Sequence, residues 1–161
     1  MLYRRHQSRI YRFAVHMSGS AAVGEEVTQE VFLALLRGGA KYDPARGSLE
    51  QFLHGVARKQ VLRYIEKDRR RENDEDVTAL QSAGDVLGDL TRKETVELLR
   101  KAVLSLPASY REVVVLCEME EMDYASAAAV MGCAVGTVRS RLSRARALLA
   151  DKLRASKGCL A

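Results

Sequence analysis

Residues 72–89 divide this chain of 161 residues into two blocks of similar size. The segment carries six acidic side chains and no lysine or arginine, its hydrophobic periodicity is weak, and small polar residues are interspersed. A segment of this kind buries too little apolar surface to fold on its own, so we expect an acidic flexible linker over 72–91. The sequence therefore predicts two small domains, 1–71 and 92–155, and a short tail, 156–161.

Both blocks are predicted to be helical, so the expected fold class is all-α. Apolar residues recur at i, i+3, i+4 and i+7, as in the stripe formed by Ile10, Phe13, Ala14 and Met17. The chain has only two prolines and few runs of β-branched residues. The predicted helices are 2–18, 21–37, 48–71, 92–104, 108–119, 124–131 and 137–150.

The ends of these helices carry recognisable capping signals. Ser20 precedes the second helix, and Ser48 with Gln51 three residues later fits a capping box. The stretch 38–48, GGAKYDPARGS, is a loop by composition. In the 92–104 helix, Val96, Leu99 and Val103 are predicted to lie on one face.

A helix-turn-helix is predicted near the C-terminal end of the chain. Asp123 can cap the short helix 124–131, and Gly132 can supply the positive φ of a corner before the longer polar helix 137–150. The alanines at 127–129 are small enough for two helices to cross closely, and Thr137 can support the first turn of the second helix.

On a helical wheel, the helix 137–150 separates into two faces. Five apolar residues form one narrow stripe: Val138, Leu142, Ala145, Leu149 and Leu153. The opposite side carries Arg139, Ser140, Ser143 and Arg144, and it is flanked by Arg141 and Arg146.

Three interpretations of this arginine-rich face are open: a solvated surface, a membrane-binding face or a DNA-reading face. A solvated face usually mixes charges of both signs, whereas 137–150 contains no Asp or Glu. The apolar stripe is narrow and lacks aromatic residues, which disfavours a membrane surface. Arginine can fork onto guanine O6 and N7, serine lets the backbone approach, and the net charge of +5 suits a polyanionic partner. The pattern favours a major-groove reader.

Nothing in the sequence indicates an enzyme, a cofactor or a metal site. The three histidines are dispersed, and no phosphate-binding loop or nucleophile elbow is present. Cys117, Cys133 and Cys159 are odd in number and lack CxxC spacing, which favours reduced thiols over disulfides. We find neither a signal peptide nor an apolar run long enough to insert in a membrane, and we expect a cytoplasmic protein.

The sequence resembles the extracytoplasmic-function (ECF) sigma factors, the smallest class of the sigma-70 family. The motifs that carry the resemblance are spread over about 2–155: LYRRHQSRIYRFAVHMSG, EEVTQEVFLALL, KYDPARGSLEQFLHGVARKQVLRYIEKDRRR and LSLPASYREVVVLCEMEEMDYASAAAVMGCAVGTVRSRLSRARALL. The resemblance implies a sigma domain 2 of three-helix type and a helix-turn-helix sigma domain 4. It also implies a dissociable subunit that recruits core RNA polymerase to promoters.

The resemblance further implies roles for individual residues. The second helix would dock on the clamp helices of the largest polymerase subunit, near Glu26, Gln29 and Glu30, and domain 4 would approach the flap region. The loop 41–48 and the helix after it would capture a base of the −10 element. The residues that supply an aromatic platform and cations for this are Tyr42, Arg46, Phe52, Arg58, Lys59 and Arg63. The −35 element would be read by Arg139, Ser140, Ser143 and Arg144, with Thr137, Arg141 and Arg146 beside them.

The chain departs from the family pattern at three places. Phe52 stands where the family usually has Trp, Lys59 where Asn is frequent, and Ser126-Ala127 where Glu-Ile is usual. The resemblance also implies control by an anti-sigma factor, and the predicted linker would let the domains rearrange. Two alternatives stay open: a helix-turn-helix regulator that binds an operator without polymerase, and a helical interaction protein that does not read DNA.

Overall fold

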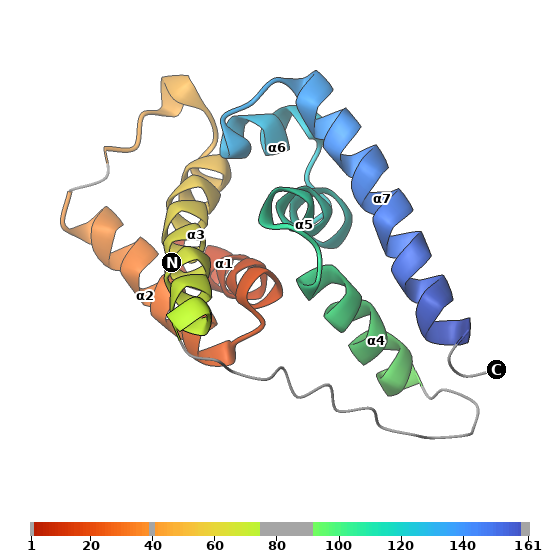
Figure 1. The fold of residues 1–161 in the computed structure, drawn as a ribbon. Helices are drawn as coiled ribbons and strands as arrows, with labels where there is room; N and C mark the ends of the chain where they lie inside the picture. Colours follow the sequence, from red (N-terminus) through yellow and green to blue (C-terminus); the bar gives the residue numbers. More distant parts are fainter. Residues whose placement is uncertain (1, 39–40, 75–91, 159–161) are drawn as a thin grey trace.

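A computed structural model gives the fold of the chain and describes residues 2–38, 41–74 and 92–158. Within these ranges the only regular elements are helical, so the predicted all-α class is confirmed (Figure 1). The first half contains α1 (Leu2–Ser18), α2 (Ala21–Leu36), a 3-10 turn (Pro44–Arg46) and α3 (Leu49–Asp74). The second half contains α4 (Arg92–Leu104), α5 (Ala108–Val114), a π-helical turn (Val115–Met119), α6 (Tyr124–Met131) and α7 (Val135–Gly158).

In the first half, α1 and α2 pack closely against each other and against α3. The predicted stripe of α1 is confirmed, because Ile10, Phe13, Ala14 and Met17 are fully buried. Gly24 of α2 permits the close approach to α1: a Cβ atom there would lie 2.5 Å from Val15 Cγ2. A larger residue at this position would push the two helices apart.

The predicted helix caps are confirmed. The Ser20 hydroxyl accepts a hydrogen bond from the Val23 backbone N–H at 3.3 Å. Ser48 and Gln51 form the reciprocal capping box, each side chain accepting from the other residue's backbone N–H at 3.2 Å. Asp123 accepts from Ser126 N at 2.8 Å and begins α6.

The second half contains the predicted helix-turn-helix, formed by α6, a corner and α7. Gly132 ends α6 with φ of 66°, in the left-handed region that glycine adopts without strain. The apolar stripe of α7 packs against α5 and α6. Val138, Leu142 and Ala145 are buried, while Leu149 and Leu153 nearer the C-terminal end are half-buried.

One predicted helix differs from the structure, and the predicted face of α4 is only partly buried. Of the three residues predicted to share that face, Val103 is buried, whereas Val96 is 47% and Leu99 is 42% exposed. The helix expected over 108–119 changes to a π-helical turn after Val114, where the Glu120 N–H bonds to Val115 O at 2.9 Å.

The ends of the long helices also differ from the predicted ends. The α3 helix continues to Asp74, three residues into the segment predicted as linker, and α7 runs from Val135 to Gly158. The rest of the predicted linker, 75–91, lies outside the described residues, as do the end of the tail and Cys159.

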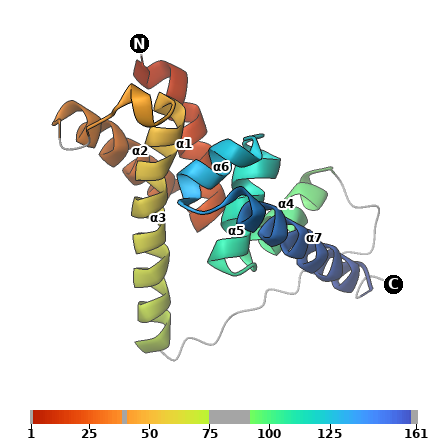
Figure 2. The same ribbon diagram turned by 90° about the horizontal axis from the view of Figure 1, so that it is seen from above.

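The two halves pack directly against each other. The α1 helix contacts α4, α5 and the π-helical turn, and α3 contacts α6. Figure 2 shows α6 beside the N-terminal part of α3, while α7 extends away from the first half. Buried residues of both halves form one hydrophobic core, which includes Phe13 and Leu53 from the first half and Leu106 and Leu116 from the second.

Candidate nucleic-acid interface

The first part of the candidate interface is the outward face of α7. Arg139, Ser140, Ser143 and Arg144 are all exposed, and the buried Leu142 lies on the opposite side of the same turns. The arrangement agrees with the helical wheel, and it presents two long cationic side chains and two short hydroxyls to solvent. In chemical terms this face can donate hydrogen bonds to base edges and phosphates.

Tyr124 lies beside one of these arginines. The Arg139 guanidinium carbon lies 5.9 Å from the centre of the Tyr124 ring, within cation–π range. The ring belongs to α6, so the first helix of the helix-turn-helix helps to orient a side chain of the second.

The residues predicted to flank this face have other surroundings. Arg146 is exposed and pairs with Glu118, to which its Nε donates at 2.8 Å, and this contact raises the pKa of Arg146. Arg141 is half-buried and lies close enough to Glu112 for the two charges to attract. Thr137 is half-buried in the first turn of α7. These three neighbours therefore differ in burial or in ion pairing from the four residues of the outward face.

The second part of the candidate interface is a pocket, which we call the loop pocket, between the loop 41–48, α3 and α6. Its volume is about 480 Å³. The rings of Tyr42 and Phe52 lie 5.5 Å apart at this pocket, and the Tyr42 hydroxyl donates to Gly47 O at 3.3 Å. The backbone beneath them is held by the 3-10 turn, where Asp43 caps Ala45 N at 3.0 Å. The aromatic pair is thus fixed by local structure.

The structure brings five of the six predicted −10 residues to the loop pocket. They are Tyr42, Arg46, Phe52, Arg58 and Lys59, and the sixth, Arg63, is exposed further along α3 without lining the pocket. The sequence did not indicate three other groups at the pocket. Lys41 adds a further cation, and Ala129 with Val130 of α6 forms a wall from the second half.

The exposed face of α2 is a separate candidate surface, because it carries carboxylates rather than cations. Glu26, Gln29 and Glu30 are all exposed, as the amphipathic pattern predicted. No ion pair neutralises either of these two carboxylates within the described part of the chain. The face is therefore a ready acceptor for cationic side chains of a protein partner.

Buried charges at the junction of the halves are functional candidates that the sequence did not reveal. Glu112 is 2% and Glu120 is 3% exposed, and both bind arginines of the first half. The one available signal was position, because Glu112 directly precedes the apolar run Val113–Leu116. Desolvation raises the pKa of Glu112, and the Arg58 partner opposes that rise.

A buried histidine predicts a pH dependence of stability. His54 is 1% exposed, its Nδ1 lies 2.9 Å from Glu50 O, and its ring meets Phe13 edge to face at 5.6 Å. Burial lowers its pKa below the ordinary 6.5, although the nearby Glu120 and Glu50 oppose this. The unfolded chain therefore takes up a proton first, and the free energy of unfolding falls as the pH drops below about 6.5.

Replacement of this histidine by leucine tests the pH effect. We expect His54→Leu to lose less stability than the wild type between about pH 7 and pH 5.5 in urea unfolding monitored by circular dichroism. Equal losses in the two proteins would contradict the assignment. Burial also lowers the pKa of His16. Because His16 is present in both proteins, each retains part of the dependence of stability on pH.

Comparison with known proteins identifies the class of the two halves. The family model described as "Sigma-70 region 2" matches residues 2–71, and the model described as "Sigma-70, region 4" matches residues 96–149. Together these two models match well over half of the chain.

Curated relatives narrow the class. The ECF RNA polymerase sigma factor SigE of Mycolicibacterium smegmatis is 32% identical over 156 residues, which cover 94% of this chain and 60% of that protein. The EcfG sigma factor of Rhodopseudomonas palustris is 32% identical over 141 residues, covering 88% of this chain and 77% of that protein. This chain belongs to the ECF sigma factors of the sigma-70 family. It spans less than two thirds of the length of the SigE relative.

Solved structures share the arrangement of both halves. The sigma factor RpoE in complex with the anti-sigma factor NepR, from Bartonella quintana, superposes with a TM-score of 0.72 at 25% identity, covering 92% of this chain and 91% of that one. CnrH in complex with the cytosolic domain of CnrY superposes with a TM-score of 0.69 at 26% identity, covering 96% and 86%. Among the described helices of this chain, none has the length and apolarity needed to cross a membrane.

Proposed function

We propose that this chain directs core RNA polymerase to specific promoters and starts transcription there. One observation carries the proposal: a single chain holds both an aromatic, cation-lined pocket and a helix face that bears hydroxyls and arginines. The pocket lies in the part of the chain that matches sigma region 2, and the helix face lies in the part that matches sigma region 4. The chain supplies recognition, and the chemistry of RNA synthesis belongs to the core enzyme. We place this activity in the cytoplasm, where the polymerase works.

In the proposed mechanism the −35 element is read as a duplex by α7. Arg139 and Arg144 reach base edges in the major groove, and Ser140 and Ser143 allow the helix backbone to approach. Arg141 and Arg146 are proposed to reach phosphates. For Arg146 this requires exchange of its Glu118 partner for DNA, which is inexpensive because the pair is exposed.

The −10 element is proposed to be read as a single strand at the loop pocket. A base that leaves the duplex stack needs an aromatic platform, which Tyr42 and Phe52 provide, and nearby cations for its phosphate, which Arg46 and Lys59 provide. Arg58 and Arg63 extend this cationic surface along α3. Capture of an extruded base would help to keep the duplex melted.

The protein partners are proposed from the exposed surfaces of the chain and from the solved structures that it resembles. Core polymerase docks its clamp helices on the acidic face of α2 at Glu26, Gln29 and Glu30, and its flap region contacts the second half. An anti-sigma factor is proposed as the regulator, because the RpoE structure named above was solved in complex with one. An operator-binding regulator would explain α4–α7 but would leave the loop pocket and the α2 face without a role.

The aromatic platform can be tested by replacing Phe52. Stacking of one base on an aromatic side chain contributes about 1–3 kcal/mol, so we expect Phe52→Ala to reduce promoter melting by roughly tenfold or more. The measurement is permanganate footprinting of unpaired thymines around −10, with core enzyme and a promoter mapped for this chain.

A conservative variant separates the platform from folding. Phe52→Trp retains a flat ring and is expected to keep most of the melting, while Phe52→Ala should still bind −35 duplex in the holoenzyme. Undiminished footprints with Phe52→Ala would refute the proposed use of the pocket.

A further inference from the structure

The loop pocket holds cations that lack an acidic partner. One of its four cations, Arg58, is paired with Glu112 of α5. The other three are Lys41, Arg46 and Lys59, which are exposed and form no ion pair with any described residue. Because ammonium and guanidinium groups only donate hydrogen bonds, the pocket offers free donors to a ligand.

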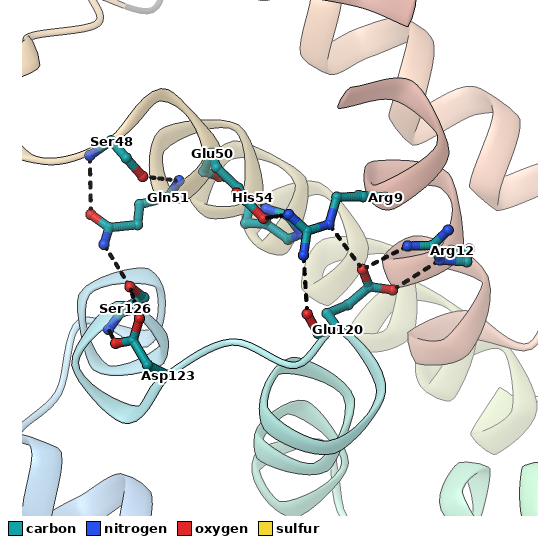
Figure 3. Close-up of polar contacts among 9 residues, drawn as sticks. All are labelled: Arg9, Arg12, Ser48, Glu50, Gln51, His54, Glu120, Asp123 and Ser126. Atoms are coloured by element: carbon teal, nitrogen blue, oxygen red, sulfur yellow. Dashed lines mark hydrogen bonds and ion pairs between the residues drawn. The ribbon is translucent and has the colours of Figure 1, made fainter. Parts of the chain in front are cut away.

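The side-chain acceptors at the pocket are largely occupied by the chain itself. Ser48 and Gln51 accept from each other's backbone N–H groups, and Gln51 Nε2 donates to Ser126 Oγ (Figure 3). Asp43 Oδ1 accepts from Ala45 N–H at 3.0 Å. The second carboxylate oxygen of Asp43 receives no hydrogen bond from the residues that the structure describes.

Three backbone carbonyls of the same loop are occupied as well. Asp43 O accepts from the N–H group that ends the 3-10 turn, at 3.0 Å. Gly47 O accepts from the Tyr42 hydroxyl at 3.3 Å. Ser48 O accepts from Phe52 N–H at 3.1 Å, in the first turn of α3. The polar groups left free at the pocket are therefore mostly donors.

Stacking on the aromatic pair does not choose between bases. Every base has a π-face, so base–aromatic stacking tolerates any sequence, and the rings of Tyr42 and Phe52 can accept any of the four bases. The free polar groups must therefore decide which base is retained.

The four bases differ in how well they suit a cationic donor. Guanine presents O6 and N7 as two adjacent acceptors, and cytosine presents O2 beside N3. Adenine places its N6 amino group, a donor, beside both N1 and N7, and thymine places the N3–H donor between O2 and O4. A cation thus gains two adjacent acceptors from guanine or cytosine, and it faces a competing donor on adenine.

Lys59 is the free cation that a helix holds in place. It follows Phe52 on α3 by seven residues, or nearly two turns, so the two residues lie on one face of the helix, about 10 Å apart along its axis. Lys41 and Arg46 belong to the loop and its 3-10 turn instead. A side chain on a helix is positioned more precisely than one on a loop, so Lys59 is the better placed reader of a base edge.

Space for a base lies on α3 between Phe52 and Lys59. Gly55 and Val56 line the pocket there. A Cβ atom added to Gly55 would meet nothing within 4 Å apart from its chain neighbours and its own helix backbone. A glycine within a helix is unfavourable relative to alanine, so helix formation does not explain this open position. It leaves room for a flat ring that stacks on Phe52 and extends toward the ammonium group.

We propose that the loop pocket selects a base with two adjacent acceptors, guanine or cytosine, that it rejects adenine, and that Lys59 is the residue that makes this choice. The Lys59 ammonium has three donor hydrogens, so it can bind the base edge as well as a phosphate. The inference rests on the proposed function, because its ligand is the base captured at the loop pocket.

The test uses the full chain bound to core polymerase. Labelled single-stranded oligodeoxynucleotides carry the non-template −10 sequence of a promoter mapped for this chain, and each position is changed in turn to the other three bases. Fluorescence anisotropy measures their dissociation constants at roughly 0.15 M NaCl. The position captured at the pocket is the one at which Phe52→Ala removes the dependence on base identity.

At that position we expect the wild type to bind the guanine or the cytosine oligodeoxynucleotide at least about fivefold more tightly than the adenine one, with thymine in between. In Lys59→Asn the adenine penalty should fall below about twofold, because an amide both donates and accepts and can form two bonds with adenine N6 and N7. Lys59→Arg should retain the penalty, since a guanidinium also only donates.

Lys67→Asn is the matched control. Lys67 is also exposed on α3 but lies outside the pocket, so its replacement removes the same charge from the same helix. It should weaken binding of all four oligodeoxynucleotides by the same factor and leave their ratios unchanged. Because Lys59 and Lys67 are both exposed, neither substitution leaves a buried group without a partner.

Adenine bound as tightly as guanine and cytosine by the wild type would overturn the proposal, and adenine bound more tightly would assign the choice to the second oxygen of Asp43 instead. An adenine penalty that Lys59→Asn leaves intact, or that Lys67→Asn lowers equally, would overturn the role of Lys59. Failure of the proposed use of the pocket is seen separately, as the absence of any position at which Phe52→Ala removes the dependence on base identity.

Discussion

Replacing Arg139 and Arg144 together by Ala is expected to abolish recognition of the −35 element while the fold remains intact. Both side chains are exposed and belong to no ion pair within the described residues, so their removal leaves no buried charge. An arginine that forks onto a guanine contributes about 1–3 kcal/mol, and two such contacts predict about a hundredfold loss of transcription from a promoter that depends on its −35 element.

The measurement is run-off transcription on the natural template and on one with a scrambled −35 element. The variant should lose the difference between the two templates. Arg154→Ala serves as the control, because Arg154 is also exposed on α7 and pairs with Asp151 within the helix. Equal weakening on both templates would mean that the two arginines contact phosphates only.

Leu142→Ala, on the opposite face of the same helix turns, is expected to act on stability instead. Leu142 is 1% exposed and packs in the core that α7 shares with α5. Truncation of a buried leucine removes apolar contacts and leaves a cavity, at a cost of about 2–5 kcal/mol. Because small domains are only marginally stable, this loss is large enough to unfold the second half in a considerable fraction of molecules.

Urea unfolding followed by circular dichroism measures this effect. Ser143→Ala is the matched control: the residue is adjacent but exposed, and an exposed substitution of this kind usually changes stability by less than about 0.5 kcal/mol. A Leu142→Ala variant as stable as Ser143→Ala would contradict the assignment of the two faces of α7.

The α7 helix was predictable because its pattern is local. A spacing of 3.6 residues identifies Val138, Leu142 and Ala145 as one face whatever the rest of the chain does, and charge then identifies the other. The loop pocket was predictable in part, since its aromatic and cationic residues lie close together in the sequence. The caps at Ser20 and Ser48 were predictable for the same reason.

The remaining features depend on contacts between distant residues. Arg58 and Glu112 are 54 residues apart, and Arg12 and Glu120 are 108 apart, so no local pattern indicates that they meet. The face of α4 makes the same point: Val96 and Leu99 have the helical spacing of the buried Val103 but are exposed, because spacing does not determine which elements pack against a helix. The packing of the two halves against each other follows only from the three-dimensional structure.

The central claim is tested most directly by reconstituted transcription. Core RNA polymerase of the native host is mixed with this chain and with genomic promoter fragments, and the 5′ ends of the transcripts are mapped. The account predicts start sites that appear only when the chain is added and that share two sequence elements upstream, near −35 and −10. Transcripts whose start sites are the same with and without the chain would contradict it.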